Sequence, residues 1–118
     1  MNMTQHARLR FQQRAISPEE LLILMEIGIT VEQKSGTSIV TVAKHECNKW
    51  ISVLKEILML LRAARATGET HSFLKRKTKA IRKLIGHLQS EHLPYFVINN
   101  EEYRVITCGH CSQRIKRN

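Results

Sequence analysis

The pattern of apolar and polar residues predicts helices in four segments of the chain, residues 4–15, 17–27, 46–66 and 71–91. The second segment has the clearest start. Ser17-Pro18-Glu19-Glu20 combines an N-cap serine, a proline in the first turn and a glutamate placed to complete a capping box. Gly28 stands where such a helix takes its C′ glycine. The chain is therefore expected to open with two short helices joined by a tight turn.

The two later helices are long and amphipathic. The face of the helix predicted over 46–66 consists of Trp50, Ile51, Leu54, Ile57, Leu58 and Leu61, and is widened by Val53, Met59 and Leu60. So broad an apolar surface predicts burial on more than one side. The helix predicted over 71–91 carries an apolar stripe of Phe73, Leu74, Ile81, Leu84, Ile85 and Leu88. Because residues 67–70 break the pattern, the two helices are expected to form an antiparallel hairpin over about 44–92.

Alternating and β-branched residues predict four strands, arranged as two hairpins. The first hairpin pairs residues 29–34 with 38–43, and the second pairs residues 94–99 with 103–107. The polar and basic last ten residues either extend the final strand or fray. The element order ααββααββ predicts an α+β fold with a small, mostly antiparallel sheet, two N-terminal helices and an inserted helical hairpin. A chain of 118 residues fits a single domain, 1–118.

The charge of the chain points to an anionic partner. Hydrophobic and charged contents of 42% and 25% are ordinary, but a net charge of +9 is not. The excess lies in three segments: residues 1–14 carry three Arg and no acid, residues 62–87 carry eight Lys/Arg and one Glu, and residues 104–118 carry four Lys/Arg and no acid. These segments either converge into one patch or form separate solvated faces. Nucleic acid is favoured over a membrane or an acidic protein as the partner.

The cysteines and the apolar runs predict a cytoplasmic protein with no membrane partner. The N-terminus has no apolar run of the kind a secretory signal needs, and the longest apolar stretch, 57–61, is far too short to span a bilayer. Three cysteines are an odd number for a disulfide framework, which favours a reducing compartment.

The string Cys108-Gly109-His110-Cys111 is identical to the active-site motif of protein disulfide isomerases. That chemistry needs a helix N-terminus within a thioredoxin-like unit, and only seven residues follow the motif here. Zinc is a second interpretation, in which His45 and Cys47 complete a set of four ligands. One Cys-x-x-Cys pair is weak evidence, so two ordinary thiols at the end of a strand are favoured and no metal or cofactor is predicted.

The helix predicted over 71–91 has a cationic face. Its basic residues are Lys75, Arg76, Lys79, Arg82 and Lys83. Such a run is usually a solvated face. The alternative is contact with a phosphate backbone, which gives salt-sensitive binding independent of sequence. The few aromatic residues all lie in apolar patterns, so an exposed platform for base stacking is not expected.

His6, Arg10 and Arg14 recur every four residues and lie on one face of the first predicted helix. If this helix packs beside the last strand, they surround a common spot with His110 and Arg114. RNA cleavage without a metal needs a base near the 2′-hydroxyl, a cation beside the phosphate and an acid for the leaving oxygen. Histidine can supply the acid or base and arginine the cation. The alternative is that these residues hydrogen-bond helix ends and are structural.

Both ends of the chain resemble a known family. The motifs are His6-x3-Arg10-x3-Arg14-x-Ile16-Ser17 followed by a helix ending at Gly28, and Val105-Ile106-Thr107-x-Gly109-His110-x3-Arg114-Ile115-Lys116-Arg117. They resemble a small bacterial domain family of unassigned function that is similar to the RelE/ParE-like toxins, which include BrnT. Those are α+β proteins of toxin–antitoxin loci. Several cleave messenger RNA, often on the ribosome, and others inhibit gyrase.

The chain departs from that family at three places. Ala15 stands where the family tends to have glycine, and Cys108 and Cys111 stand where relatives tend to have an aliphatic and a basic residue. The helical hairpin in the middle is also expanded. The loss of one cation from the site and the enlarged middle both weigh against catalysis.

The resemblance implies a RelE-like, metal-independent endoribonuclease toxin that acts on mRNA and is neutralised by an acidic antitoxin protein. His110 is then the general acid or base, Arg10 and Arg14 bind the scissile phosphate, and His6 orients or assists. The further nucleic-acid-binding residues are Arg104, Arg114, Lys116, Lys75, Arg76, Lys79, Arg82 and Lys83.

The alternative is a non-catalytic basic protein on the same scaffold, of phage or plasmid origin. Such a protein binds RNA or DNA through the basic hairpin, or blocks a machine that handles nucleic acids. The apolar breadth of residues 46–66 also permits a homodimer or antitoxin interface.

Overall fold

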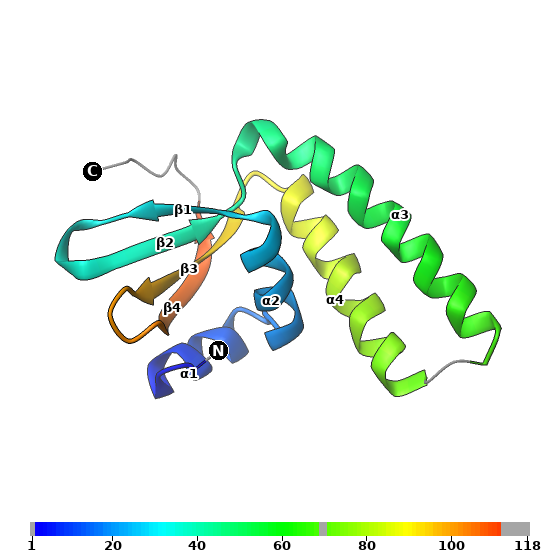
Figure 1. Cartoon of the computed structure of the whole chain (residues 1–118), viewed down its shortest axis with the longest axis horizontal. Helices are drawn as coiled ribbons and strands as arrows, with labels where there is room; N and C mark the ends of the chain where they lie inside the picture. Colours follow the sequence, from blue (N-terminus) through cyan, green and yellow to red (C-terminus); the bar gives the residue numbers. More distant parts are fainter. Residues whose placement is uncertain (1, 69–70, 112–118) are drawn as a thin grey trace.

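The computed structural model describes residues 2–68 and 71–111, and within them the predicted element order ααββααββ is confirmed (Figure 1). The α-helices are α1 (Gln5–Gln13), α2 (Pro18–Ile27), α3 (Cys47–Ala66) and α4 (His71–Gln89). The strands are β1 (Ile29–Glu32), β2 (Thr37–Thr41), β3 (Leu93–Asn99) and β4 (Arg104–Cys111). Short 3₁₀ segments span Lys34–Gly36 and Lys44–Glu46. The last strand therefore continues to Cys111, beyond the predicted end at residue 107.

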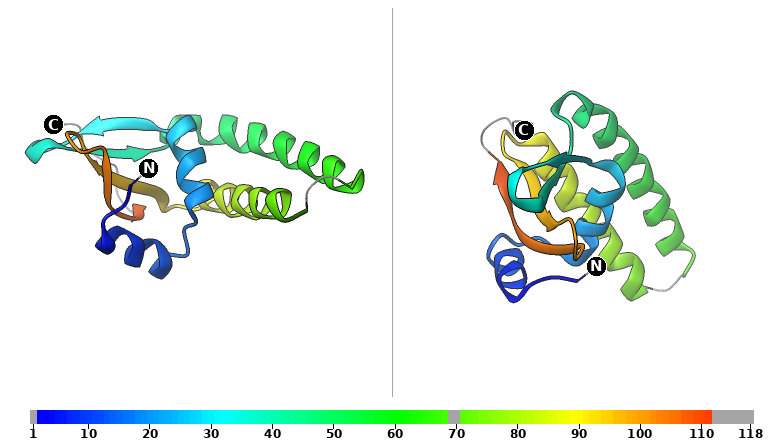
Figure 2. Two further views of the ribbon diagram at one scale, coloured as in Figure 1. Left: turned by 60° about the horizontal axis from the view of Figure 1, so that its bottom comes forward. Right: turned by 60° about the vertical axis from the view of Figure 1, so that its left-hand side comes forward.

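The four strands form one antiparallel sheet in the order β1-β2-β3-β4, and the helical hairpin is inserted between the neighbouring strands β2 and β3. The N-terminal segment lies beside β4 (Figure 2). There the Thr4 amide donates to the Val105 carbonyl at 3.0 Å, and the Val105 amide donates to the Asn2 carbonyl at 2.9 Å. These hydrogen bonds hold the start of α1 beside the strand that carries His110.

One face of the sheet builds the core with α1, α2 and α4. The buried side chains of β3 are Pro94, Phe96 and Ile98, which alternate with half-buried neighbours. Ala7 and Phe11 of α1 are buried against this face, and Leu54, Leu84 and Val105 are among the most deeply buried side chains. The hairpin of α3 and α4 extends away from the sheet, so the molecule is elongated, 49 × 31 × 23 Å (Figure 1).

The expectation that α3 is buried on more than one side is wrong. Only Cys47 and Leu54 of this helix are buried, while Met59 and Leu60 are 68% and 70% exposed. Past the edge of the sheet α3 has α4 as its neighbour on one side, so the apolar side chains beyond that contact face solvent (Figure 1).

The turns around α2 differ from the sequence expectation in one respect. Ser17 and Glu20 form the predicted capping box, in which the Ser17 amide donates to Glu20 Oε2 at 2.7 Å. Gly28 ends the helix in an extended conformation, with φ −84° and ψ 169°, and not as a left-handed C′ glycine. Ala15 adopts the left-handed conformation instead, with φ 54°, in the turn between α1 and α2. The structure thus explains why glycine suits position 15.

Candidate functional site

Glu20 of α2, His87 of α4 and His110 of β4 come together between the sheet and the helices that cover one of its faces. The capping box directs the Glu20 side chain inward, where it is 2% exposed. Its Oε1 atom lies 3.4 Å from His87 Nδ1, a distance of an ion pair when His87 is protonated. The ring of His87 meets the ring of His110 edge to face, with 4.7 Å between ring centroids. We call His87 and His110 the histidine pair.

Each member of the histidine pair is placed by a regular element. His87 lies in the last turn of α4, three residues after the buried Leu84. His110 lies on β4 opposite Pro94, on the same face of the strand as the buried Cys108. Gly109 lies between them on the outer face, where a Cβ atom would come within 3.0 Å of Tyr95 Oη. The glycine therefore makes room for the Tyr95 ring while its two neighbours face the helices.

Burial keeps the histidine pair neutral. Burial lowers the pKa of His87, and the Lys83 charge lowers it further. The pKa of His110 is also lowered, first by burial and then by His87 and Arg14, while Glu20 opposes this shift. Burial raises the pKa of the Glu20 carboxyl, although its hydrogen bonds with Ser17 and the Lys83 charge hold it down. At neutral pH His110 is therefore a neutral imidazole, able to accept a proton.

One nitrogen of His110 is enclosed. Nε2 is buried and has no hydrogen-bond partner within the described residues, although the residue as a whole is half-exposed. A protonated imidazole needs partners for both of its N–H groups, so this enclosure agrees with the lowered pKa.

Arg10 and Arg14 reach the site, whereas His6 does not. Their charges act on Cys108, and the Arg14 charge also acts on His110. Each four-residue step along a helix advances about 40° beyond a full turn, so the stripe of basic residues winds around α1. Arg14 comes nearest to the face of the buried Phe11, while His6 ends on an exposed side. His6 therefore lies outside the cluster that the sequence placed it in.

Cys108 is an inert thiol. Burial raises its pKa to about 11, and Arg14 and Arg10 offset this only in part. A redox-active Cys-x-x-Cys needs a lowered thiol pKa, typically at a helix N-terminus. Cys108 lies in β4, so the chemistry of the disulfide isomerase motif does not apply.

The residues considered for zinc do not gather. His45 is 84% exposed in its side chain and lies near Glu46, while Cys47 is buried at the start of α3. In the part of the chain that the structure describes, no group of three or more His, Cys, Asp or Glu side chains is arranged to hold a metal ion. The Cys111 side chain lies outside the described part.

The five cations that the sequence singled out on α4 divide into two groups. Lys75, Lys79 and Arg82 are exposed. Lys83 donates to the Ala15 carbonyl at 2.7 Å, and Arg76 Nε lies 3.9 Å from Glu19 Oε1, so both contact the region where α1 meets α2. Lys83 also acts on His87, and Arg14 acts on His110, so one cation from each of the first two basic segments lies near the histidine pair.

The predicted cations of the last segment lie elsewhere or outside the described residues. Arg104 begins β4, six residues or about 20 Å of strand from His110, and its Nη1 lies 3.7 Å from Glu102 Oε2. Arg114 and Lys116 lie outside the described residues.

No ligand-sized cavity opens beside the histidine pair in the described part. The cavity there is about 10 Å³, bounded by residues including Glu20, His87, Phe96 and Cys108. That volume is about one water molecule. Any substrate would therefore lie across the surface formed by the half-exposed His110 and the arginines.

Sequence reasoning missed Glu20 and His87 as members of the site. Glu20 was explained by the capping box, which it does form, and the position of its second oxygen was not predictable. His87 follows Leu84 by three residues, so its place at the edge of the buried stripe of α4 was the available signal. A polar residue at the edge of such a stripe needs a partner when it is buried.

The histidine pair makes the protein sensitive to acid. Both pKa values lie below the ordinary value near 6.5, so on acidification the unfolded chain binds protons before the folded protein does. The stability that the pair contributes is fully present above about pH 6.5, the unfolded-state pKa. It is lost as the pH falls from there through the lower pKa values of the folded protein. Glu20, whose pKa is raised, acts in the opposite sense above pH 4.5.

We expect the free energy of unfolding, measured in urea at pH 7.5, 6.5 and 5.5, to decrease as the pH is lowered. In a double variant with His87→Gln and His110→Gln the fall should be smaller. A variant with His45→Gln, an exposed histidine, should keep the full fall. Equal slopes for the wild type and the double variant would contradict this assignment.

No helix of the described residues is long and apolar enough to cross a membrane. Comparisons with protein-family models, with curated proteins and with solved structures find no match for this chain.

Proposed function

We propose that the protein is a metal-independent endoribonuclease of RelE-like type, with His110 as its general base. The observation that carries this proposal is the half-exposed His110 ring. It packs on His87, whose Nδ1 lies near the buried Glu20, and the Arg14 charge acts on it. Titratable groups whose pKa values are shifted by burial beside a cation are typical of catalytic sites.

The reaction needs only groups that this cluster supplies, together with water. Neutral His110 takes the proton from the ribose 2′-hydroxyl, and the 2′-oxygen attacks the adjacent phosphorus. The bond between phosphorus and the 5′-oxygen breaks, and the products are a 2′,3′-cyclic phosphate and a 5′-hydroxyl. We assign the proton on the leaving oxygen to solvent. Arg14 and Arg10 attract the phosphate and stabilise the charge that develops on it.

Glu20 and His87 position His110 and do not contact the substrate. His87 packs edge to face on the His110 ring and fixes its orientation, and Glu20 Oε1 lies near His87 Nδ1. Because His110 Nε2 is buried, the substrate meets the ring at Nδ1, and the tautomer with the proton on Nε2 is the reactive one.

We assign further phosphate contacts to the exposed cations of α4. Lys75, Lys79 and Arg82 are exposed there and are suited to contact phosphates outside the scissile position. Such contacts carry little sequence information and weaken as salt rises. We infer that choice of cleavage site comes from elsewhere, such as the ribosome.

The test is cleavage of end-labelled RNA, free and bound to translating ribosomes, with EDTA present in the free-RNA arm. We expect the wild type to yield 2′,3′-cyclic phosphate ends and His110→Gln to be at least about 100-fold slower, the usual contribution of a general base. His45→Gln is the matched control and should cleave like the wild type. His6→Gln should also retain activity, because His6 is exposed outside the cluster.

If wild-type protein leaves both RNA forms intact but binds RNA or DNA at low salt, the non-catalytic alternative holds instead. The observation that favours it is the exposed cationic face of α4, which serves binding without any chemistry. Cleavage unchanged in His110→Gln would also reject the proposed mechanism. An acidic antitoxin, a homodimer through the exposed side of α3 and a cytoplasmic location stay predictions.

A further inference from the structure

A third histidine, His92, lies in the short turn that joins α4 to β3, and it is exposed. Its amide donates to Ser90 Oγ at 3.2 Å. The Ser90 hydroxyl lies within donating distance of two carbonyl oxygens, at 2.8 Å from that of His87 and 3.0 Å from that of His92. Ser90 therefore ties the turn that carries His92 to the last turn of α4, which carries His87.

The register of the sheet places His92 close to His110. Pro94 of β3 pairs directly with His110 of β4, and His92 precedes Pro94 by two residues. A step of two residues keeps the same face in an extended chain. Diagonal neighbours of an antiparallel pair are about 7–8 Å apart, which long side chains can span. The charge of His92 does act on His110, since it lowers the pKa of that residue.

We propose that His92 is the general acid of the reaction and gives a proton to the leaving 5′-oxygen. This inference rests on the proposed ribonuclease function. With the histidine pair alone, that oxygen takes its proton from solvent, whereas a placed acid supplies it in the transition state. The attacking and leaving oxygens lie roughly in line through phosphorus. Base and acid must therefore flank the phosphate, and two imidazoles in diagonal positions leave room for it between them.

The two histidines balance the protons of the reaction. Neutral His110 takes the proton of the 2′-hydroxyl as the 2′-oxygen bonds to phosphorus. Protonated His92 gives its proton to the 5′-oxygen as the bond between phosphorus and that oxygen breaks. Exchange of one proton each with water then restores both residues. Their surroundings suit these roles, because burial favours a neutral His110 and water surrounds the exposed His92.

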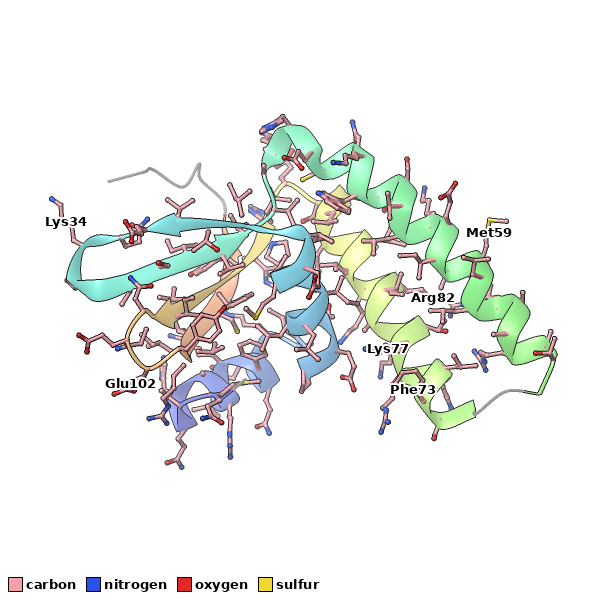
Figure 3. All side chains as sticks on the ribbon, in the orientation of Figure 1. Lys34, Met59, Phe73, Lys77, Arg82 and Glu102 are labelled. Atoms are coloured by element: carbon pink, nitrogen blue, oxygen red, sulfur yellow. The ribbon has the colours of Figure 1, made fainter. Side chains whose placement is uncertain are left out.

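Other proton donors among the described residues are less well placed. The Tyr95 ring packs on the outer face of the sheet, away from the helices. The Lys83 ammonium donates to a backbone carbonyl of the α1–α2 turn at 2.7 Å. Glu102 lies in the turn at the opposite end of β3 and β4 from His110 (Figure 3). His92 is therefore the donor that both the register and the exposure favour.

The test compares two RNAs that differ in one atom. One is ordinary RNA, and the other carries sulfur in place of the bridging 5′-oxygen at a site mapped with the wild type. Each is offered free and on translating ribosomes. A thiol is far more acidic than an alcohol, so a thiolate leaves without a proton. We expect His92→Gln to cleave ordinary RNA at least about 100-fold more slowly than the wild type, and the sulfur-containing RNA less than about threefold more slowly.

Three further variants serve as controls. His45→Gln makes the same change at an exposed histidine of another loop, and Glu91→Gln changes the exposed neighbour of His92 in its own turn. Both should cleave the two RNAs like the wild type. His110→Gln removes the base and should slow the cleavage of both RNAs alike. Thermal melting should show that every variant folds like the wild type.

The inference alone fails if His110→Gln behaves as expected but His92→Gln cleaves ordinary RNA like the wild type. It also fails if His92→Gln slows both RNAs by the same factor, because His92 would then not act on the leaving group. If the wild type cleaves neither RNA, the proposed function fails and the inference falls with it. If His110→Gln cleaves normally while sulfur selectively rescues His92→Gln, the proposed base is wrong and the acid is supported.

Discussion

Replacing Phe96 by alanine is expected to destabilise the protein by about 3–5 kcal/mol, the usual range for a large aromatic residue removed from a core. Phe96 is 1% exposed on β3, opposite Cys108, and borders the small cavity beside His87. The truncation enlarges that cavity where polar groups already line it, so we expect water to enter. Contact with water removes part of the burial that lowers the pKa of His87, which should therefore rise.

Urea unfolding measures the first effect, and NMR titration of the imidazole protons measures the second. Val97→Ala is the control, because Val97 is the next residue of the strand and is half-buried on the other face. Val97→Ala should lower the free energy of unfolding by less than about 1.5 kcal/mol. A similar small loss in Phe96→Ala would mean that the helices do not pack on this face as described.

Replacing Gly28 by alanine is expected to destabilise the protein by about 3 kcal/mol, at the upper end of the range for overpacking. A Cβ atom at this position would lie 2.5 Å from the Leu24 carbonyl oxygen and 2.8 Å from the Thr41 carbonyl oxygen. Both are backbone atoms, so relief requires the last turn of α2 to open and β2 to move away from Gly28. The conformation of Gly28 is open to any residue, which makes this a steric effect alone.

Gly86→Ala is the matched control, because nothing lies within 4 Å of a Cβ atom at this exposed position of α4. Alanine is the better helix former, so this variant should gain about 0.5–1 kcal/mol. Urea unfolding of both variants gives opposite signs if the structure is right. Equal effects would show that the close contact of α2 with β2 is absent.

The local features of this fold were readable from the chain. The Ser17-Pro18-Glu19-Glu20 string predicted the start of α2 and its capping box. Alternation in residues 29–34 and β-branched residues in 38–43 predicted the first hairpin. These predictions succeeded because caps, turns and strand periodicity depend on residues close together in the chain. The prediction that α3 is buried on more than one side was wrong, because the number of apolar residues in a helix does not say how many elements pack against it.

The candidate site shows the same division. The stripe of His6, Arg10 and Arg14 was visible as spacing, but the winding of α1 brings only the two arginines toward Cys108. The cationic face of α4 was visible too, whereas its meeting with the α1–α2 turn through Lys83 and Ala15 was not. Spacing sets which residues share a face, and packing sets where that face points.

The sequence by itself determined the element order, the capping box, the excess positive charge and the exposure of a basic face on α4. Only the tertiary structure decided that Glu20, His87 and His110 meet, because they lie on three elements up to 90 residues apart. Their contact depends on how α2 and α4 pack against each other and against the sheet, and so on many weak apolar contacts in the core. No local pattern encodes that packing, and the lowered pKa values of the histidine pair follow from it.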